Sequence, residues 1–273
     1  MPSPLSSEQV QSYDKLGYLF PLCVLDTEEV TRHRADVEDL QKRLGGQPSA
    51  TDLAQTHLSF RWSYDLALNP RVLDAVEAVL GPDVLVLASS IFAKYAHNPS
   101  YISWHQDATY WGLDAGKVTT AWIALSPSTS ESGCMRVVPE TQKEEIHPHV
   151  ETYAKDNLLT RGQEIAVDVD EKDAVDLILK PGEMSLHHVN IIHGSNPNRS
   201  DDQRIGFAVR YVTPDVQQQA ERQPAILARG EDRHGNFPLM KSPPSLGTDA
   251  AVAAHMELSR KMVEAIRKTK GAF

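Results

Sequence analysis

Cysteine, positive charge and long apolar runs are all scarce in this chain of 273 residues. Its two cysteines, Cys23 and Cys134, are too few for a disulfide framework and are typical of a reducing compartment. No apolar run reaches the ~18 residues that a membrane span needs. Residues 1–20 also lack the basic region and apolar core of a secretory signal. We therefore expect a cytoplasmic protein with no membrane partner.

Acidic residues outnumber basic ones by 37 to 27, which gives a formal net charge of −10. The lysines and arginines are scattered along the sequence rather than clustered, so we expect no nucleic-acid partner. A composition of 41% hydrophobic and 23% charged residues is typical of a soluble globular protein. A chain of this length can bury a sizeable core, and we expect one domain over residues 1–273, with the oligomeric state left open.

Helical patterns fill residues 6–81. Cap residues at 6–9 begin a short helix that should stop by Gly17, and a longer helix follows over residues 26–46. Residues 70–81 repeat the pattern. The apolar stripe of the long helix consists of Val30, Val37, Leu40 and Leu44. We expect these helices to buttress a sheet.

From residue 83 to about residue 213 the pattern changes to short apolar runs separated by turn residues. The expected strands cover residues 84–87, 90–95, 118–125, 134–138, 185–192 and 205–213. Such a series predicts a mainly β fold with flanking helices, in which the antiparallel sheet is closed or sandwiched. Residues 214–246 show little periodicity and predict a long loop or lid, whereas residues 248–268 predict one covering helix.

The stretch Trp104-His105-Gln106-Asp107 carries the clearest sign of chemistry. His105 and Asp107 are two residues apart, so on an extended strand their side chains leave the same face and can bind one ion together. Two histidines and one carboxylate, with the opposite face of the metal open, form the ligand set of non-haem Fe(II) oxygenases. The residues alone leave the second histidine open, and the rivals are His187, His188 and His193.

Three segments closely resemble the phytanoyl-CoA dioxygenase family of Fe(II)- and 2-oxoglutarate-dependent oxygenases. These segments are residues 101–125, 132–139 and 181–211. The resemblance implies a double-stranded β-helix, that is, a jelly roll of the cupin kind, and an enzyme that uses Fe(II), 2-oxoglutarate and O2. It also implies the catalytic metal ligands, which would be His105, Asp107 and His193.

The resemblance further implies a set of residues that bind the co-substrate. Arg204 would hold the far carboxylate of 2-oxoglutarate through a two-pronged salt bridge, helped by Ser195, because a buried carboxylate needs a planar charged partner. Trp122 would line the pocket. Gln106 also matches a family residue near the co-substrate, although the middle residue of His-x-Asp faces away from the metal unless the strand twists.

The strand that begins at Arg204 gives a second line of reasoning. Gly206, Ala208 and Arg210 should point to the same side as Arg204, and the two small residues would leave room for a co-substrate. Arg210 is then a secondary candidate for binding an anion. The residues that we expect on the substrate side, or else in the core, are Lys94, Trp104, Tyr110 and Trp111.

The expected reaction is oxidation of a C–H bond, with hydroxylation as the first expectation and with release of succinate and CO2. The strings GEMSLHH and NPNRSDDQRIGFAVRYVTP resemble the small-molecule hydroxylase branch of the family, so we expect a small polar or secondary metabolite as substrate. Desaturation, ring formation or another oxidative outcome remains an alternative. An alternative of another class is a jelly-roll binding protein without catalysis.

Overall fold

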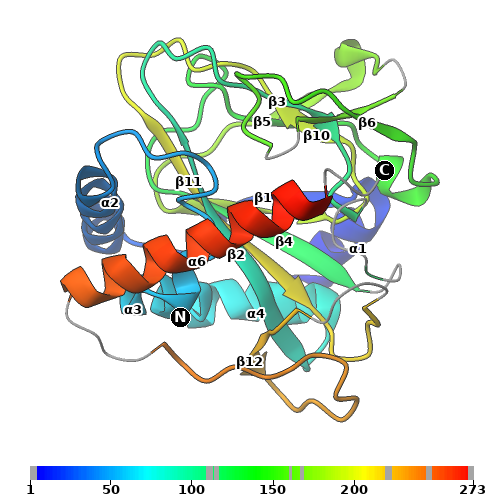
Figure 1. Ribbon diagram of the computed structural model, residues 1–273. Coiled ribbons are helices and arrows are strands. Elements are labelled where there is room, and N and C mark those ends of the chain that lie inside the picture. The colour runs from blue at the N-terminus through cyan, green and yellow to red at the C-terminus, as the bar shows by residue number, and fades with distance from the viewer. Residues whose placement is uncertain are drawn as a thin grey trace.

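Helices, a larger sheet and a smaller sheet form three successive layers in the computed structural model (Figure 1). The structure describes residues 5–108, 113, 117–159, 162–166, 169–218, 223–243 and 248–269. The main apolar core joins the helices to one face of the larger sheet. A second core lies between the two sheets and includes Trp122, Val137 and Ala208. The functional side chains found below also lie between the sheets.

The N-terminal helices begin and end where the sequence predicts. Helix α1 (Ser7–Leu16) and helix α2 (Thr27–Arg43) each start with a capping box, in which Ser6 and Asp26 accept from the backbone three residues on. Gly17 ends α1 in the left-handed conformation. The remaining helical elements of this part are η1 (Thr56–Leu58), α3 (Arg61–Ala67) and α4 (Pro70–Leu80). The sequence reasoning did not predict α3.

The larger sheet is antiparallel and has the order β1-β9-β4-β11-β2-β12. Its strands are β1 (Tyr18–Cys23), β9 (Glu183–His188), β4 (Val118–Ala124), β11 (Arg204–Val212), β2 (Val84–Lys94) and β12 (Ile226–Arg229). The sequence predicted two strands where β2 runs without a break. Its register against β11 shifts beside Arg210 and Tyr211, so a bulge lies where the break was expected.

The smaller sheet faces the larger one and has the order β3-β10-β5-β8. Its strands are β3 (Ile102–His105), β10 (His193–Ser195), β5 (Met135–Val137) and β8 (Val175–Leu177). A separate pair is made by β6 (His149–Glu151) and β7 (Gln163–Ile165), and short 3-10 turns occupy η2 (Thr141–Lys143) and η3 (Glu171–Asp173). Two facing antiparallel sheets confirm the predicted jelly roll with helices on its flank.

The C-terminal part is more regular than the sequence suggested. Within residues 214–246, predicted as a loop or lid, β12 extends the larger sheet beside β2. Helix α6 (Thr248–Thr269) follows and crosses the molecule, shown in red in Figure 1. It buries Ala251, His255 and Ser259, whereas Met256 is exposed.

Hydrogen bonds explain why α6 buries polar residues as well as Ala251. His255 Nε2 lies 2.7 Å from the carbonyl oxygen of Asp52, and the hydroxyl of Ser259 donates to the Asp52 carboxylate. The carboxylate of Asp52 also accepts from Ser49. Helix α6 is therefore fastened to the loop that follows α2. In the described part of the chain, no helix combines the length and the apolar character that a membrane crossing requires.

Candidate active site

Two neighbouring strands of the smaller sheet bring the predicted histidines together. His105 is the last residue of β3 and lies directly opposite His193, the first residue of β10, with ring centroids 4.1 Å apart. Asp107 follows two residues later, and its Oδ1 lies 3.5 Å from His105 Nε2. One ligand atom from each of the three residues lies within 4.8 Å of the others. Such a cluster has the geometry to hold one metal ion.

Hydrogen bonds fix the orientation of both imidazoles. His105 Nδ1 lies 2.9 Å from the carbonyl oxygen of Ser103, and His193 Nδ1 lies 3.0 Å from that of Ile191. A carbonyl oxygen only accepts, so each Nδ1 carries the proton and each Nε2 keeps its lone pair for a metal. This backbone support is the arrangement that a metal-binding histidine requires.

The charge states of Asp107 and His193 also fit a divalent cation. Burial opposes the charge of the Asp107 carboxyl, but the neighbouring side chains of His105, His193 and Arg210 outweigh that effect and lower its pKa. Burial and the neighbouring His105 lower the pKa of His193 well below its ordinary value. One carboxylate and two neutral imidazoles are the protonation states in which these groups bind metals.

The two rival histidines occupy different places. His187 lies on β9 of the larger sheet, lines the same pocket, and has its ring centroid 4.9 Å from that of His193. His188, the next residue, accepts a hydrogen bond at Nδ1 from the backbone of Asn190. Neither belongs to the cluster of three ligand atoms. His187 therefore forms part of the pocket wall.

Arg204 lies at the inner end of this pocket, on the opposite sheet. It is only 2% exposed, and its Nε and Nη2 find no hydrogen-bond partner among the described residues. Burial lowers the pKa of Arg204 to about 10, so the guanidinium remains charged at neutral pH. Its Cζ lies 5.1 Å from the centre of the Trp122 ring. A buried charge with unpaired donors is costly by itself and indicates a site for an anion.

Ser195 also lines the pocket, and the buried Lys94 is hydrogen-bonded to it. Lys94 on β2 lies opposite Arg204 on β11 and is fully buried. Its Nζ donates to Ser195 Oγ at 2.7 Å and to the carbonyl oxygen of Asn196. Burial and the charge of Arg204 lower the pKa of Lys94 to about 5. The sequence reasoning placed Lys94 on the substrate side, whereas the structure places it beside the predicted co-substrate residues.

Gly206 provides the space that Trp122 occupies. A Cβ atom at position 206 would lie 1.8 Å from Cζ2 of the Trp122 indole. Ala208 and Arg210, further along β11, line the same pocket. The alternation predicted for this strand is thus confirmed, but the room at Gly206 is filled by the tryptophan rather than left empty.

Replacing Gly206 by alanine should therefore destabilise the fold. Overpacking of this kind costs about 1–3 kcal/mol, and urea unfolding monitored by fluorescence would measure the loss. The double variant Gly206→Ala/Trp122→Phe removes the outer ring of the indole and should recover part of that free energy. If Gly206→Ala were as stable as the parent, the Trp122 indole would have to be able to move aside without cost.

Gln106 is held away from the metal ligands. Its side-chain nitrogen donates to the carbonyl oxygen of Asn190, and its side-chain oxygen accepts from the backbone of His147. Its backbone N–H donates to His149 Nε2. Gln106 therefore braces the loop after β3 and is not among the pocket-lining residues, although the family pattern placed it near the co-substrate.

Of the aromatic residues predicted on the substrate side, only Trp104 lies among the described residues. Trp104 stacks under Arg136, whose Cζ lies 5.4 Å from the ring centre, and it does not line the metal-ligand pocket. Tyr110 and Trp111 lie outside the described residues. Phe92 and Leu159 do line the pocket, and the sequence reasoning missed both. Phe92 could have been found, because it shares the strand parity of Lys94.

The fold and the ligand cluster define a non-haem metal oxygenase. A family model for "Phytanoyl-CoA dioxygenase (PhyH)" matches residues 13–206, so the chain belongs to the phytanoyl-CoA dioxygenase family. It is an Fe(II)- and 2-oxoglutarate-dependent dioxygenase, as the sequence predicted. This result decides against the non-catalytic binding protein.

Similar proteins support the same class. The chain is 25% identical over 231 residues to a probable alpha-ketoglutarate-dependent hypophosphite dioxygenase of Stutzerimonas stutzeri, covering 77% of this chain and 79% of the relative. It is 28% identical to the 1-deoxypentalenic acid 11-beta-hydroxylase of Streptomyces arenae, covering 70% and 74%. The solved non-heme monooxygenase ThoJ is 31% identical with a TM-score of 0.78, covering 94% and 99%.

Proposed function

We propose that this enzyme oxidises a C–H bond of a small polar or secondary metabolite, most simply by hydroxylation, with release of succinate and CO2. One observation supports the proposal above all. The buried Arg204 guanidinium, with Nε and Nη2 unpaired among the described residues, lines the same pocket as the cluster of His105, Asp107 and His193. A dicarboxylate that bridges the two would satisfy both groups at once.

The residues would divide the work as follows. His105, Asp107 and His193 would hold Fe(II), which, when bound, supplies the activation of O2. Arg204 would pair with the far carboxylate of 2-oxoglutarate, with the hydroxyl of Ser195 beside it. Lys94 would orient that hydroxyl through its 2.7 Å hydrogen bond.

Of the two remaining predicted residues, Trp122 would shape the co-substrate site and Gln106 would not. Trp122 would form one wall, since its ring already lies against the Arg204 guanidinium. Gln106, despite the family pattern, would act only as a brace for the loop after β3. The pocket therefore fixes one end of a co-substrate and leaves its reacting end to the metal ligands.

The names of relatives support a small-molecule substrate. The relative from Stutzerimonas stutzeri is named for hypophosphite, and the relative from Streptomyces arenae is named for 1-deoxypentalenic acid. A relative from Bordetella parapertussis is named ectoine dioxygenase. A second outcome, ring formation, is favoured by the likeness to the carbocyclase SnoK, which is 25% identical with a TM-score of 0.64. We also propose a cytoplasmic location, which the free Cys23 and Cys134 support.

Succinate release would test the proposal directly. Anaerobic protein with Fe(II) should develop a visible metal-to-ligand charge-transfer band when 2-oxoglutarate is added. Exposure to O2 with a panel of small polar metabolites should then give succinate in proportion to one oxidised product. Absence of both the band and succinate would contradict the proposed function, and a product two hydrogens short of its substrate would select the ring-forming or desaturating outcome.

A further inference from the structure

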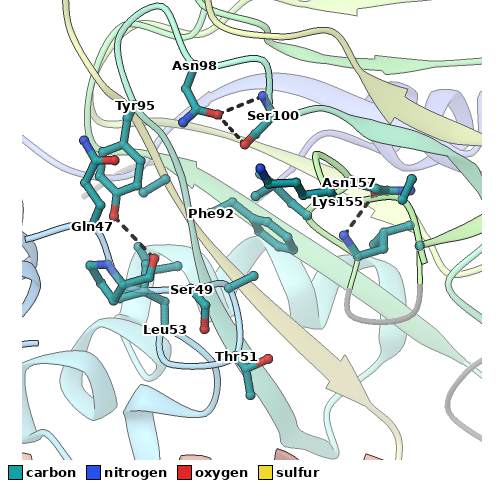
Figure 2. Close-up of a pocket in the computed structure, with 18 of the residues that line it drawn as sticks. Gln47, Ser49, Thr51, Leu53, Phe92, Tyr95, Asn98, Ser100, Lys155 and Asn157 are labelled. Atoms are coloured by element: carbon teal, nitrogen blue, oxygen red, sulfur yellow. Dashed lines mark hydrogen bonds between the residues drawn. The ribbon is translucent and has the colours of Figure 1, made fainter. Parts of the chain in front are cut away.

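A larger chamber adjoins the pocket of the metal ligands. Its volume is about 460 Å³, within the range of sites that hold drug-sized molecules. Its walls come from the loop at residues 47–53, the C-terminal half of β2 with the turn after it, and residues 153–159 with Gly162. In Figure 2, Ser49 and Thr51 lie on one side of Phe92, Asn98 and Ser100 on another, and Lys155 and Asn157 on a third.

Two residues connect the chamber with the metal-ligand pocket. Phe92 and Leu159 line both cavities. On the inner side, the Cζ of Arg210 lies 5.6 Å from the centre of the Phe92 ring. A molecule in the chamber would therefore contact two side chains that also line the metal-ligand pocket. This position suits the substrate of an oxidation, because its reacting carbon must come close to the metal.

The chamber wall is held in place from outside. The loop at residues 47–53 is fastened to α6 through Asp52, which binds Ser259 by its side chain and His255 by its carbonyl oxygen. Ile91 of β2 donates its backbone N–H to the carbonyl oxygen of Leu53 in the same loop. Hydrogen bonds of Asp52 and Leu53 thus hold the wall that contains Thr51, and a larger side chain at Thr51 would reduce the space within the chamber.

The lining has an unusual balance of charge for a protein with a net charge of −10. Among the described residues that line the chamber, none carries a carboxylate, and Lys155 is the single charged side chain. The neutral polar members of the lining are Gln47, Ser49, Thr51, Tyr95, Asn98, Ser100, Tyr153 and Asn157. Leu53, Ile91 and Phe92 contribute apolar surface. Hydroxyl and amide groups of this kind pair with hydroxyl and carbonyl oxygens of a ligand.

We infer that this chamber binds the primary substrate, and that the substrate is an uncharged or singly anionic, oxygen-rich molecule whose anionic group faces Lys155. An ammonium group would be repelled by Lys155 and would find no carboxylate among the described lining residues. A coenzyme A thioester would bring several phosphate charges to one lysine. The inference rests on the proposed function and specifies the substrate class for it.

Three probes with one skeleton would test the charge preference. These are a trifluoromethyl-biphenyl carboxamide, the corresponding carboxylate and the corresponding methylammonium, each followed by fluorine NMR. The carboxamide and the carboxylate should bind, and the methylammonium should bind at least about tenfold more weakly. With 2-oxoglutarate present, Mn(II) in place of Fe(II) should broaden the fluorine signal of the bound probes, and diamagnetic Zn(II) should not.

Two wall variants would locate the probes. Thr51→Trp should weaken binding of the carboxamide and the carboxylate by more than about tenfold. Ser100→Trp fills the opposite wall and should do the same, so a folding defect of one variant leaves the other as the test. In both, the charge-transfer titration of Fe(II) protein with 2-oxoglutarate should match the parent. Unweakened probe binding in a folded variant would overturn the inference.

Lys155→Glu would test the single cation. The substitution should weaken binding of the carboxylate probe by about three- to tenfold and leave the affinity of the carboxamide probe within about twofold of the parent. Lys172→Glu, on η3 and outside the chamber lining, is the matched control and should change neither probe. Tightest binding of the methylammonium, or no broadening by Mn(II), would overturn the inference. Loss of the charge-transfer band in the parent would instead contradict the proposed function, whatever the order of the probes.

Discussion

Replacing His193 by alanine is expected to abolish succinate formation and to weaken Fe(II) binding by more than about 100-fold, since loss of an outer partner of a metal ligand alone costs about 10–100-fold. The reason is geometric. His193 lies opposite His105 across the β3–β10 pair, and one ligand atom of each, with one of Asp107, lies within 4.8 Å of the others. Anaerobic titration with Fe(II) and assay of succinate would measure the two effects separately.

His187→Ala is the matched control for this prediction. His187 is equally buried, and its ring centroid lies 4.9 Å from that of His193, but it stands on the opposite sheet and outside the ligand cluster. It should keep Fe(II) binding, and His188→Ala should keep both Fe(II) binding and turnover. Survival of iron binding and activity in His193→Ala, together with their loss in His187→Ala, would reverse the ligand assignment.

Replacing Arg204 by alanine should weaken the binding of 2-oxoglutarate by about 30-fold to several thousand-fold, since losing one member of a close buried charged pair costs about 2–5 kcal/mol. Arg204 would be the partner of the far carboxylate, and its Nε and Nη2 have no other partner among the described residues. Fe(II) should still bind, because the three ligands lie on other elements. The charge-transfer band should therefore appear only at much higher 2-oxoglutarate concentration.

Arg204→Lys distinguishes charge from shape at this position. Lysine keeps the charge but cannot make the two-pronged contact of a guanidinium, so it should recover the affinity only in part. The stacking on Trp122, now at 5.1 Å, would also be lost. An unshifted titration in Arg204→Ala would move the anchor to another cation of the pocket, with Arg210 as the next candidate.

Local periodicity was enough to predict much of the site. The two-residue spacing of His105 and Asp107 predicted a shared strand face, and the structure places both side chains in one pocket. The same period along β11 placed Arg204, Ala208 and Arg210 together. The choice of His193 over His187 needed the family resemblance, since both have the same strand parity and both line the pocket.

Contacts between distant elements could not be predicted from local sequence. Lys94 binds Ser195, which lies 101 residues away on the other sheet, and no spacing rule connects them. Helix α6 buries His255 and Ser259 because Asp52 offers them hydrogen bonds, and apolar periodicity gives no sign of these two buried polar residues. Tertiary hydrogen bonds outweigh a weak apolar pattern in such cases.

The position of the site between two sheets affects the dynamics of the whole fold. His105 and His193 belong to the smaller sheet, whereas Arg204 and Trp122 belong to the larger one. A co-substrate held at both ends would therefore tie the sheets together, and free energy of binding would add to the free energy of opening them. Amide hydrogen exchange in β10 and β11 should slow together when metal and co-substrate bind, so occupancy of the site would set how often the jelly roll opens.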